Sequence, residues 1–239
     1  MTRTKTDQAD VRAIADLVHT LSLKAPEKLE HTRLVNDPQR DDLALWLQEF
    51  DRCRRSIARL RNQIHTIKHE TASVASVILK RREDQLARML EEQQEVKREV
   101  EAAFRVWKSR DAELLCSIKG VGVLTAASIL TSIGSIDQFQ SADAFKGFFG
   151  IYPRRRQSGK SEKPSRLANH GNQLVRHNLW NAARSAVMYN PLCRAYFEQL
   201  VARGKHKAAA YGAVARKLLQ IIYGVLKTRT HFKIPETTT

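Results

Sequence analysis

A serine followed by glycine, Ser158-Gly159, lies in the most basic loop of this chain of 239 residues. The cations around it are Arg154, Arg155, Arg156, Lys160, Lys163 and Arg166. A serine hydroxyl attacks phosphorus only when it is activated, and guanidinium groups can lower its pKa and stabilise the charge that develops on a phosphate. Ser158 is therefore a candidate nucleophile. The alternative is a serine that only binds phosphate or is solvated.

A second pattern, Lys119-Gly120-Val121-Gly122, fits the turn of a helix–hairpin–helix. Glycines allow a tight turn and a close approach to phosphate, and the following helix would offer free N–H groups and the positive end of its dipole. Lys119, Gly120 and Gly122 are therefore candidate phosphate-binding residues, which would read no bases. The alternative is an ordinary tight turn between packed helices.

Two carboxylates and two histidines have spacings that could suit a metal. Asp7 and Asp10 are three residues apart near the start of an expected helix over residues 1–23, which places both on one face. Acidic capping of that helix is the alternative, and two carboxylates are too few for a two-metal centre. His65 and His69 are four apart, but no third ligand is near in sequence, so a solvated helix face is the competing interpretation.

The charge is concentrated in the C-terminal part. The chain has a net charge of +16, and residues 151–239 hold 17 Lys+Arg against 3 Asp+Glu, a net of +14. This favours binding to a polyanion, and Arg176 and Lys205 are further candidate phosphate contacts. A membrane surface is the rival polyanion, but there is no 18-residue apolar run and no signal peptide. Three widely spaced cysteines indicate neither disulfides nor zinc, which favours a cytoplasmic protein.

Two heptad seams predict a long coiled coil. The first consists of Leu43, Trp46, Phe50, Cys53, Ile57, Leu60, Ile64 and Ile67. The second consists of Leu86, Met89, Gln93, Val96, Val100, Ala103 and Trp107. The register falters between His69 and Arg82, so we expect either an antiparallel helical hairpin or two long helices that pair with another copy. Either form would be a spacer or a dimerisation arm, and a homo-oligomer is expected.

The rest of the chain also reads as helical. Helices are expected over residues 125–133, 141–149, 172–188, 192–202 and 208–226, with a basic loop over 151–165. The predicted fold is all-α, a long coiled-coil helical hairpin followed by a compact helical domain with a helix–hairpin–helix. The expected divisions are a first segment over 1–37, the coiled-coil arm over 38–112 and the basic helical domain over 113–239.

These motifs together resemble the C-terminal domain of the serine-containing DEDD transposases, the insertion-sequence type 110 and 1111 group, from about Leu114 to Phe232. The matching pieces, in order, are residues 118–122 with Thr125-Ala126, Phe145 through Pro153, Ser158-Gly159, Gly171-Asn172 with Arg176, Ala182-Ala183, Arg203-Gly204-Lys205 and residues 215–219. Lys5 through Asp10 is similar to the segment that ends the family's N-terminal RuvC-like nuclease domain, and the coiled coil lies where the family has a helical insert.

The resemblance implies a DNA transposase or site-specific recombinase, guided by a structured RNA that pairs with donor and target DNA. It implies a RuvC-like site that binds Mg²⁺ through four acids, of which Asp7 and Asp10 match the last two. Ser158 matches the serine that attacks DNA and holds it covalently. DNA and guide RNA are the implied partners, further copies of the chain are expected from the heptad seams, and the expected location is the cytoplasm, in association with the nucleoid.

The first two acids of that site would lie upstream of Asp7, so the resemblance predicts an N-terminally truncated transposase that lacks most of the RuvC-like domain. Mg²⁺ is then expected only if missing or partner residues complete the site. Asn169-His170-Gly171-Asn172 also replaces a Lys-x-Gly-Asn pattern common in the family, which removes one basic contact. The alternative function is a non-catalytic nucleic-acid-binding fragment that associates with a full-length transposase and modulates it.

Overall fold

The computed structural model describes residues 37–69, 75–107, 109–151 and 171–233, four two-residue strands between 153 and 167, and the isolated helical positions Asp16 and His19. Packing groups residues 37–239 into one compact unit and residues 1–36 into another. Asp7, Asp10 and most of the helix expected over 1–23 lie outside the described residues.

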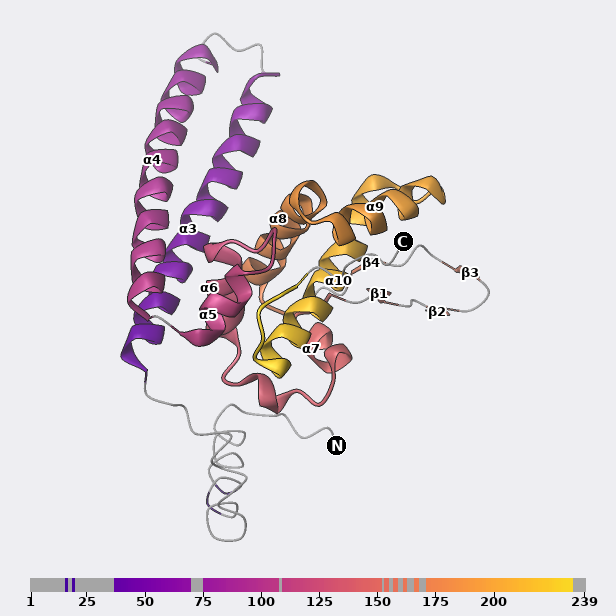
Figure 1. The fold of residues 1–239 in the computed structure, drawn as a ribbon. Helices are drawn as coiled ribbons and strands as arrows, with labels where there is room; N and C mark the ends of the chain where they lie inside the picture. Colours follow the sequence, from indigo (N-terminus) through magenta and orange to yellow (C-terminus); the bar gives the residue numbers. More distant parts are fainter. Residues whose placement is uncertain are drawn as a thin grey trace, which may run out of the picture. The chain divides into compact units, whose positions relative to one another are not determined.

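A hairpin of two long helices forms an arm, α3 (Pro38–Ile67) and α4 (Ala75–Trp107), which run antiparallel (Figure 1). Asp37 caps α3 by accepting a hydrogen bond from the Arg40 amide at 3.1 Å, and Pro38 follows in the first turn, where its missing N–H costs nothing. Of the two arrangements that the heptads allow, the structure shows the pairing within one chain.

The hairpin buries six of the eight predicted seam residues of α3, but only Val96 and Val100 of the seven on α4. The buried side chains are Leu43, Leu47, Phe50, Cys53, Ile57, Leu60 and Ile64 on α3, and Val96, Val100 and Phe104 on α4. The prediction was wrong at Trp46, which is 38% exposed, whereas Leu47 is 3% exposed. The physical reason is that the base of α3 packs against α6 as well as α4, so the buried face widens from the narrow seam to the i, i+4 pair Leu43 and Leu47.

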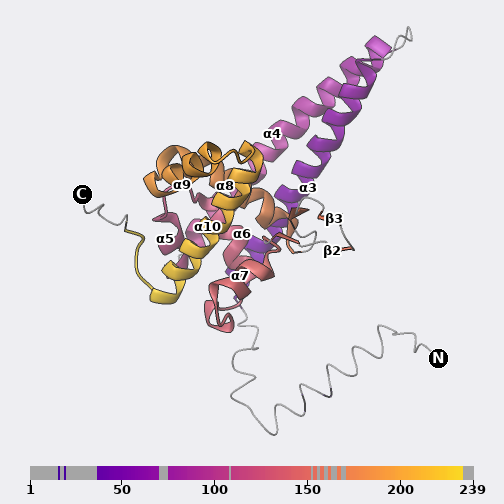
Figure 2. The same ribbon diagram turned by 90° about the vertical axis from the view of Figure 1, so that its right-hand side faces the viewer.

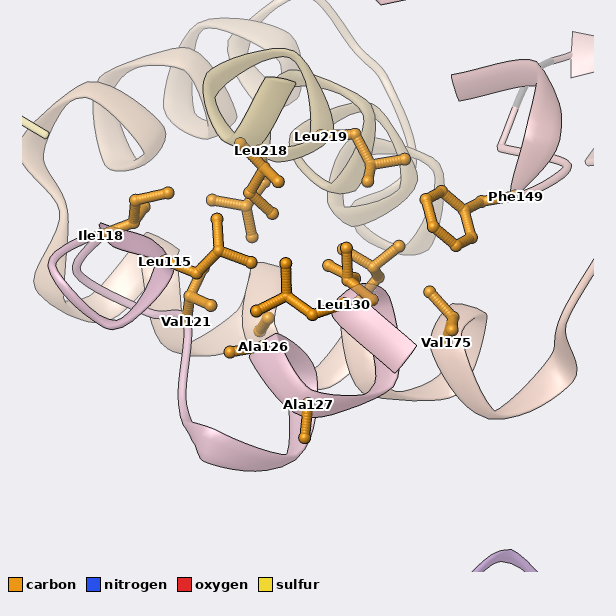
Figure 3. Packing of buried hydrophobic residues seen from close by; sticks show 14 of the residues in the cluster. Leu115, Ile118, Val121, Ala126, Ala127, Leu130, Phe149, Val175, Leu218 and Leu219 are labelled. Atoms are coloured by element: carbon orange, nitrogen blue, oxygen red, sulfur yellow. The ribbon is translucent and has the colours of Figure 1, made fainter. Parts of the chain in front are cut away.

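The remaining helices form a bundle. They are α5 (Arg110–Cys116), α6 (Val123–Ser132), the 3₁₀ turn η1 (Ile136–Gln138), α7 (Ala142–Phe148), α8 (Gln173–Tyr189), α9 (Pro191–Ala202) and α10 (Lys207–Thr228). Aliphatic side chains of α6, α8 and α10 meet in its core with Phe149, which follows α7 (Figure 3). The all-α fold class predicted from the sequence is confirmed. No helix in the described part of the chain has the length and apolarity needed to cross a membrane.

The segment expected as a basic loop contains two short antiparallel strand pairs, which we together call the ribbon. Strand β1 (Pro153–Arg154) pairs with β4 (Arg166–Leu167), and β2 (Gln157–Ser158) pairs with β3 (Ser161–Glu162). The prediction of a loop over 151–165 was wrong in this respect. Alternation of apolar and polar residues reveals a strand only over four or more positions, and these strands have two residues each.

The base of the arm is rooted in the bundle. The Arg40 guanidinium donates to the carbonyls of Thr131 and Ile133, at 3.0 and 2.9 Å, and so satisfies acceptors at the C-terminal end of α6. The Trp107 indole donates to Asp37 at 2.7 Å and closes the base of the hairpin. Buried residues of α3 and α4 belong to the same hydrophobic cluster as those of the bundle. The arm therefore shares a core with the bundle at its base.

We expect Val100→Asp to destabilise the arm by about 3 kcal/mol or more, because Val100 is 0% exposed and a buried carboxylate there has no partner. Val106→Asp is the matched control on the same helix, since Val106 is 62% exposed, and it should cost less than about 1 kcal/mol. Thermal unfolding followed by circular dichroism measures both. Equal shifts in Tm for the two variants would contradict the buried seam.

Candidate nucleic-acid interface

The turn between α5 and α6 is built on a close backbone approach at Gly120. Gly120 has a φ of +104°, and a Cβ atom there would lie 2.6 Å from the Cα of Ala186 on α8. Both the conformation and the contact exclude a side chain. Gly122 differs, because its φ is −96° at the N-cap of α6 and a Cβ would meet nothing within 4 Å. Packing therefore requires the first glycine, and the second leaves the start of α6 uncovered.

A buried asparagine holds this turn against the start of α9. Asn190 is 0% exposed and caps α9 by accepting from the Leu192 amide at 3.1 Å. Its side-chain amide donates to the carbonyl of Lys119 at 3.5 Å. Lys119 is exposed and lies four residues before Val123, where the first-turn amides of α6 begin. Such an arrangement of a cation and helix N-terminal amides can hold a phosphate.

Polar groups also hold α6 against α8 inside the core. The buried Asn178 amide donates to the Leu124 carbonyl and to the Ser128 hydroxyl, both at 3.2 Å. The Thr125 hydroxyl donates to the backbone carbonyl of Asn178 at 3.3 Å. Each of these buried groups has a partner, so the contact is specific in register as well as tight.

The start of α8 is a second feature built for close approach. Gly171 has a φ of +89°, and a Cβ there would lie 2.7 Å from the carbonyl of Phe149. Asn172 caps α8 by accepting from the amides of Leu174 and Val175, at 2.9 and 3.3 Å, and donates to the Ser132 hydroxyl at 3.1 Å. Arg176 follows in the first turn and is half-buried.

A groove of about 530 Å³ opens beside this helix start. Its walls come from α3, α6 and the residues on either side of the ribbon, since Phe148 precedes β1 and Gly171 follows β4. Asp51 and Arg55 line it on the arm side and form an ion pair at 3.2 Å. Within the ribbon, the backbone of Ser158 is paired with that of Ser161, and two residues lie between them. The groove is thus next to the two ends of the segment that carries the candidate nucleophile.

The predicted site residues fall into three groups, according to how much of each residue the structure describes. Side chains are described for Lys119, Arg176 and Lys205, and the backbone for Gly120 and Gly122. Only strand pairing is described for Arg154, Ser158 and Arg166. The residues outside the described set are Asp7, Asp10, Arg155, Arg156, Lys160 and Lys163.

The described binding residues are not brought to one point. Lys119 lies at the C-terminal end of α8, where Gly120 meets Ala186, whereas Arg176 lies in the first turn of that helix. The 17 residues of α8 span about 25 Å. Lys205 is exposed beyond the far end of α9, in the turn that leads to α10. The candidate phosphate contacts are therefore spread over a surface that suits an extended polymer.

No metal site is supported among the described residues. His65 and His69 are exposed with ring centroids 5.0 Å apart, and no third ligand joins them in the described region. One described trio, Glu49, Cys53 and Glu92, brings possible ligand atoms within 4.8 Å of one another. Arg52 pairs with both of its carboxylates, and burial raises the pKa of the Cys53 thiol, which favours its protonated form. The trio is better explained as an ion-pair cluster.

Ion pairs fasten the end of α10. Lys227 donates to Asp137 at 3.1 Å, and this hydrogen bond is the main reason that the pKa of the Asp137 carboxyl is lowered. Arg229, in the left-handed region at φ 55°, pairs with Asp111 and with Asp137 at 3.6 Å.

Arg216 on α10 was not among the predicted binding residues, yet its Nε is buried without a hydrogen-bond partner in the described part of the protein. Burial of an arginine nitrogen without a partner can be seen only in the folded structure, so the sequence could not single out Arg216.

Fold and charge define a basic helical domain that presents helix N-termini, a ribbon and a helical arm. Residues 112–198, from α5 into α9, match the family model described as Transposase IS116/IS110/IS902 family. The resemblance stated from the sequence motifs is thereby confirmed for this part of the chain.

Curated relatives agree with this match. The chain is 28% identical over 120 residues to an insertion element IS110 protein of Streptomyces coelicolor, which covers 50% of this chain and 30% of that protein. It is 29% identical to the transposase for insertion sequence element IS1111A of Coxiella burnetii, over 52% of this chain and 35% of the relative. It is 32% identical to a pilin gene-inverting protein of Moraxella bovis, over 51% of this chain and 38% of that relative. The aligned part of the chain thus spans about a third of the length of these relatives.

Gly120→Ala should lower the free energy of unfolding by about 1 to 3 kcal/mol, because it adds a Cβ both at positive φ and against the backbone of Ala186. Gly122→Ser is the control, since the N-cap has an ordinary φ and serine is a favourable N-cap residue. Denaturant unfolding compares the two variants. A Gly120→Ala protein as stable as Gly122→Ser would show that the close approach to α8 is absent.

Proposed function

We propose that this chain takes part in DNA transposition or site-specific recombination, and that its C-terminal domain binds DNA through backbone phosphates. The observation that carries the proposal is the match of residues 112–198 to a transposase family, because that stretch contains the Gly120 turn, the ribbon and the start of α8. The net charge of +14 over residues 151–239 supplies the electrostatic attraction that such binding needs.

Ser158 is the proposed nucleophile. Its Oγ would form a bond to a DNA phosphorus while the bond from phosphorus to a deoxyribose oxygen breaks. The serine proton would pass to solvent or a nearby base, and the departing oxygen would take up a proton to become a hydroxyl group. The arginines of the ribbon segment, Arg154, Arg155 and Arg156, would stabilise the charge on the pentacoordinate phosphorus.

Asp7 and Asp10 are the proposed Mg²⁺ ligands, together with two further acids from other residues or a partner. Two carboxylates alone cannot hold and position a pair of metal ions. A structured guide RNA, homo-oligomerisation and a cytoplasmic location at the nucleoid complete the proposal. The guide RNA rests on resemblance to the family, homo-oligomerisation rests on the heptad seams, and the cytoplasmic location rests on the three widely spaced cysteines.

We expect log affinity for duplex DNA to fall linearly with log salt concentration, with a slope of about −0.9 for each neutralised phosphate. Changing Arg154, Arg155 and Arg156 together to Gln should weaken binding about equally for unrelated DNA sequences and reduce the slope by roughly 2 to 3. Fluorescence anisotropy across a salt series is the measurement. A flat salt dependence of the unaltered protein would remove the basis for phosphate binding.

A covalent protein–DNA adduct should form with Mg²⁺ only when Asp7 and Asp10 are joined by two more acids, supplied by a nuclease segment fused ahead of residue 1. In that fusion, Ser158→Ala should abolish the adduct and leave DNA affinity nearly unchanged, whereas Ser161→Ala should keep it. Denaturing gel electrophoresis of labelled DNA detects the adduct. An adduct that survives Ser158→Ala identifies another nucleophile, and DNA binding without any adduct favours the alternative function of a non-catalytic, modulating fragment.

A further inference from the structure

The charges of the arm are segregated along its length. Residues 52–88, which include the end of α3 and the beginning of α4, hold ten Lys+Arg against three Asp+Glu, a net of +7. The base of the arm consists of residues 37–51 and 89–107. It holds four Lys+Arg against ten Asp+Glu, a net of −6. We call the described part of the first segment, residues 52–69 and 75–88, the arm tip. A net charge counted over the whole N-terminal part of the chain does not show this basic surface, because the acidic base cancels it.

Helix stability does not explain where these charges lie on α4. Arg81 and Arg88 are exposed and lie seven residues apart, which places them on one helix face, and the exposed Lys80 lies beside them. The same face continues towards the C-terminus with acids such as Glu95. The first turn of α4 contains no acid. The helix dipole acts mainly within the first and last turns, and the last turn of α4 holds a base, Arg105, so the dipole does not account for the grouping of these cations.

Several cations of the arm tip have no ion-pair partner in the described region. Lys68 pairs with Glu83 at 3.4 Å, and the arginines nearest the base pair with acids of α3. Arg59, Arg61, Lys80, Arg81 and Arg88 are exposed and make no such pair with any described residue. Their charges are therefore available to an external anion.

The composition of the arm tip points to phosphate as that anion. Eight of the ten cations over residues 52–88 are arginine, whose planar guanidinium binds phosphate oxygens through two parallel hydrogen bonds. A second copy of the chain fits less well. The apolar faces of α3 and α4 are already buried against each other, and charged residues are depleted at the centres of protein–protein interfaces.

We propose that the arm tip is a second DNA-binding surface, which holds backbone phosphates of duplex DNA beyond the part held by the C-terminal domain. The inference rests on the proposed function, which makes DNA the substrate. Figures 1 and 2 both show the hairpin projecting away from the bundle. The part of α3 that belongs to the arm tip, residues 52–67, spans about 24 Å, the length of roughly 7 base pairs at about 3.4 Å each. The tip can therefore reach DNA that the bundle does not contact.

The test compares two triple variants that each remove three positive charges from the arm. One changes the tip, Arg59→Gln, Arg81→Gln and Arg88→Gln. The other changes the base, Lys97→Gln, Arg98→Gln and Arg105→Gln. On a duplex of about 40 base pairs at about 0.1 M salt, the tip variant should bind on the order of tenfold more weakly, with a salt slope reduced by roughly 2 to 3. The base variant should change affinity less than about twofold, because its cations lie among acids.

Circular dichroism must show equal helicity for both variants and the unaltered chain, and sedimentation must show equal mass. Equal weakening by both variants would overturn the proposal, since it would reflect net charge alone. Undiminished binding by the tip variant would overturn it while leaving the proposed function intact, whereas an unaltered chain that binds no DNA would refute the proposed function itself. If the tip variant lost affinity for duplex RNA but not for duplex DNA, the surface would bind RNA instead. If it changed the sedimenting mass and not the affinity for DNA, the surface would bind another copy of the chain.

Discussion

The contact between Gly120 and Ala186 is the constraint on which the C-terminal domain depends. The turn after α5 lies so close to α8 that a single added carbon would stand 2.6 Å from the Ala186 backbone. With the turn held there, Asn178 can bind α6 from within the core, and Asn190 can bind the Lys119 carbonyl. Lys119 is exposed and lies four residues before the first residue of α6. One close helix contact thus positions a cation and a helix N-terminus together.

The same core extends into the arm. Arg40 binds carbonyls at the end of α6, and Leu43 and Leu47 are buried in the cluster that the bundle shares. A long hairpin attached only by a loop would move independently, but one that shares hydrophobic packing with a domain takes its direction from that domain. Rooting the arm in the bundle therefore matters for any role of its far end, because the tip acquires a defined place relative to the bundle.

The spread of candidate contacts is consistent with a polymeric ligand. Lys119 and Arg176 stand towards opposite ends of α8, and Lys205 lies past the end of α9. The groove beside Asn172 has a volume of about 530 Å³ and is bordered by the ion pair of Asp51 and Arg55. Small-molecule sites gather their polar groups into one concave pocket, whereas phosphate contacts to a duplex are distributed along its backbone. The predicted phosphate contacts of this protein are distributed in the second way.

The sequence by itself determined the helical fold class, the approximate bounds of the helices, the hairpin as one of two options and the resemblance to a transposase family. These depend on local periodicity, on caps such as Asp37 and Asn172 and on motif order, which a chain carries without its tertiary structure. Only the tertiary structure decided that Leu47 replaces Trp46 in the core, because the second helix packed on α3 is distant in sequence. It also showed the two-residue strands, which are too short for any period, and the basic arm tip, whose charge cancels against the acidic base in a linear count. Packing between segments that are distant in sequence decides which residues share a surface. The spacing of residue types along the chain does not determine that packing.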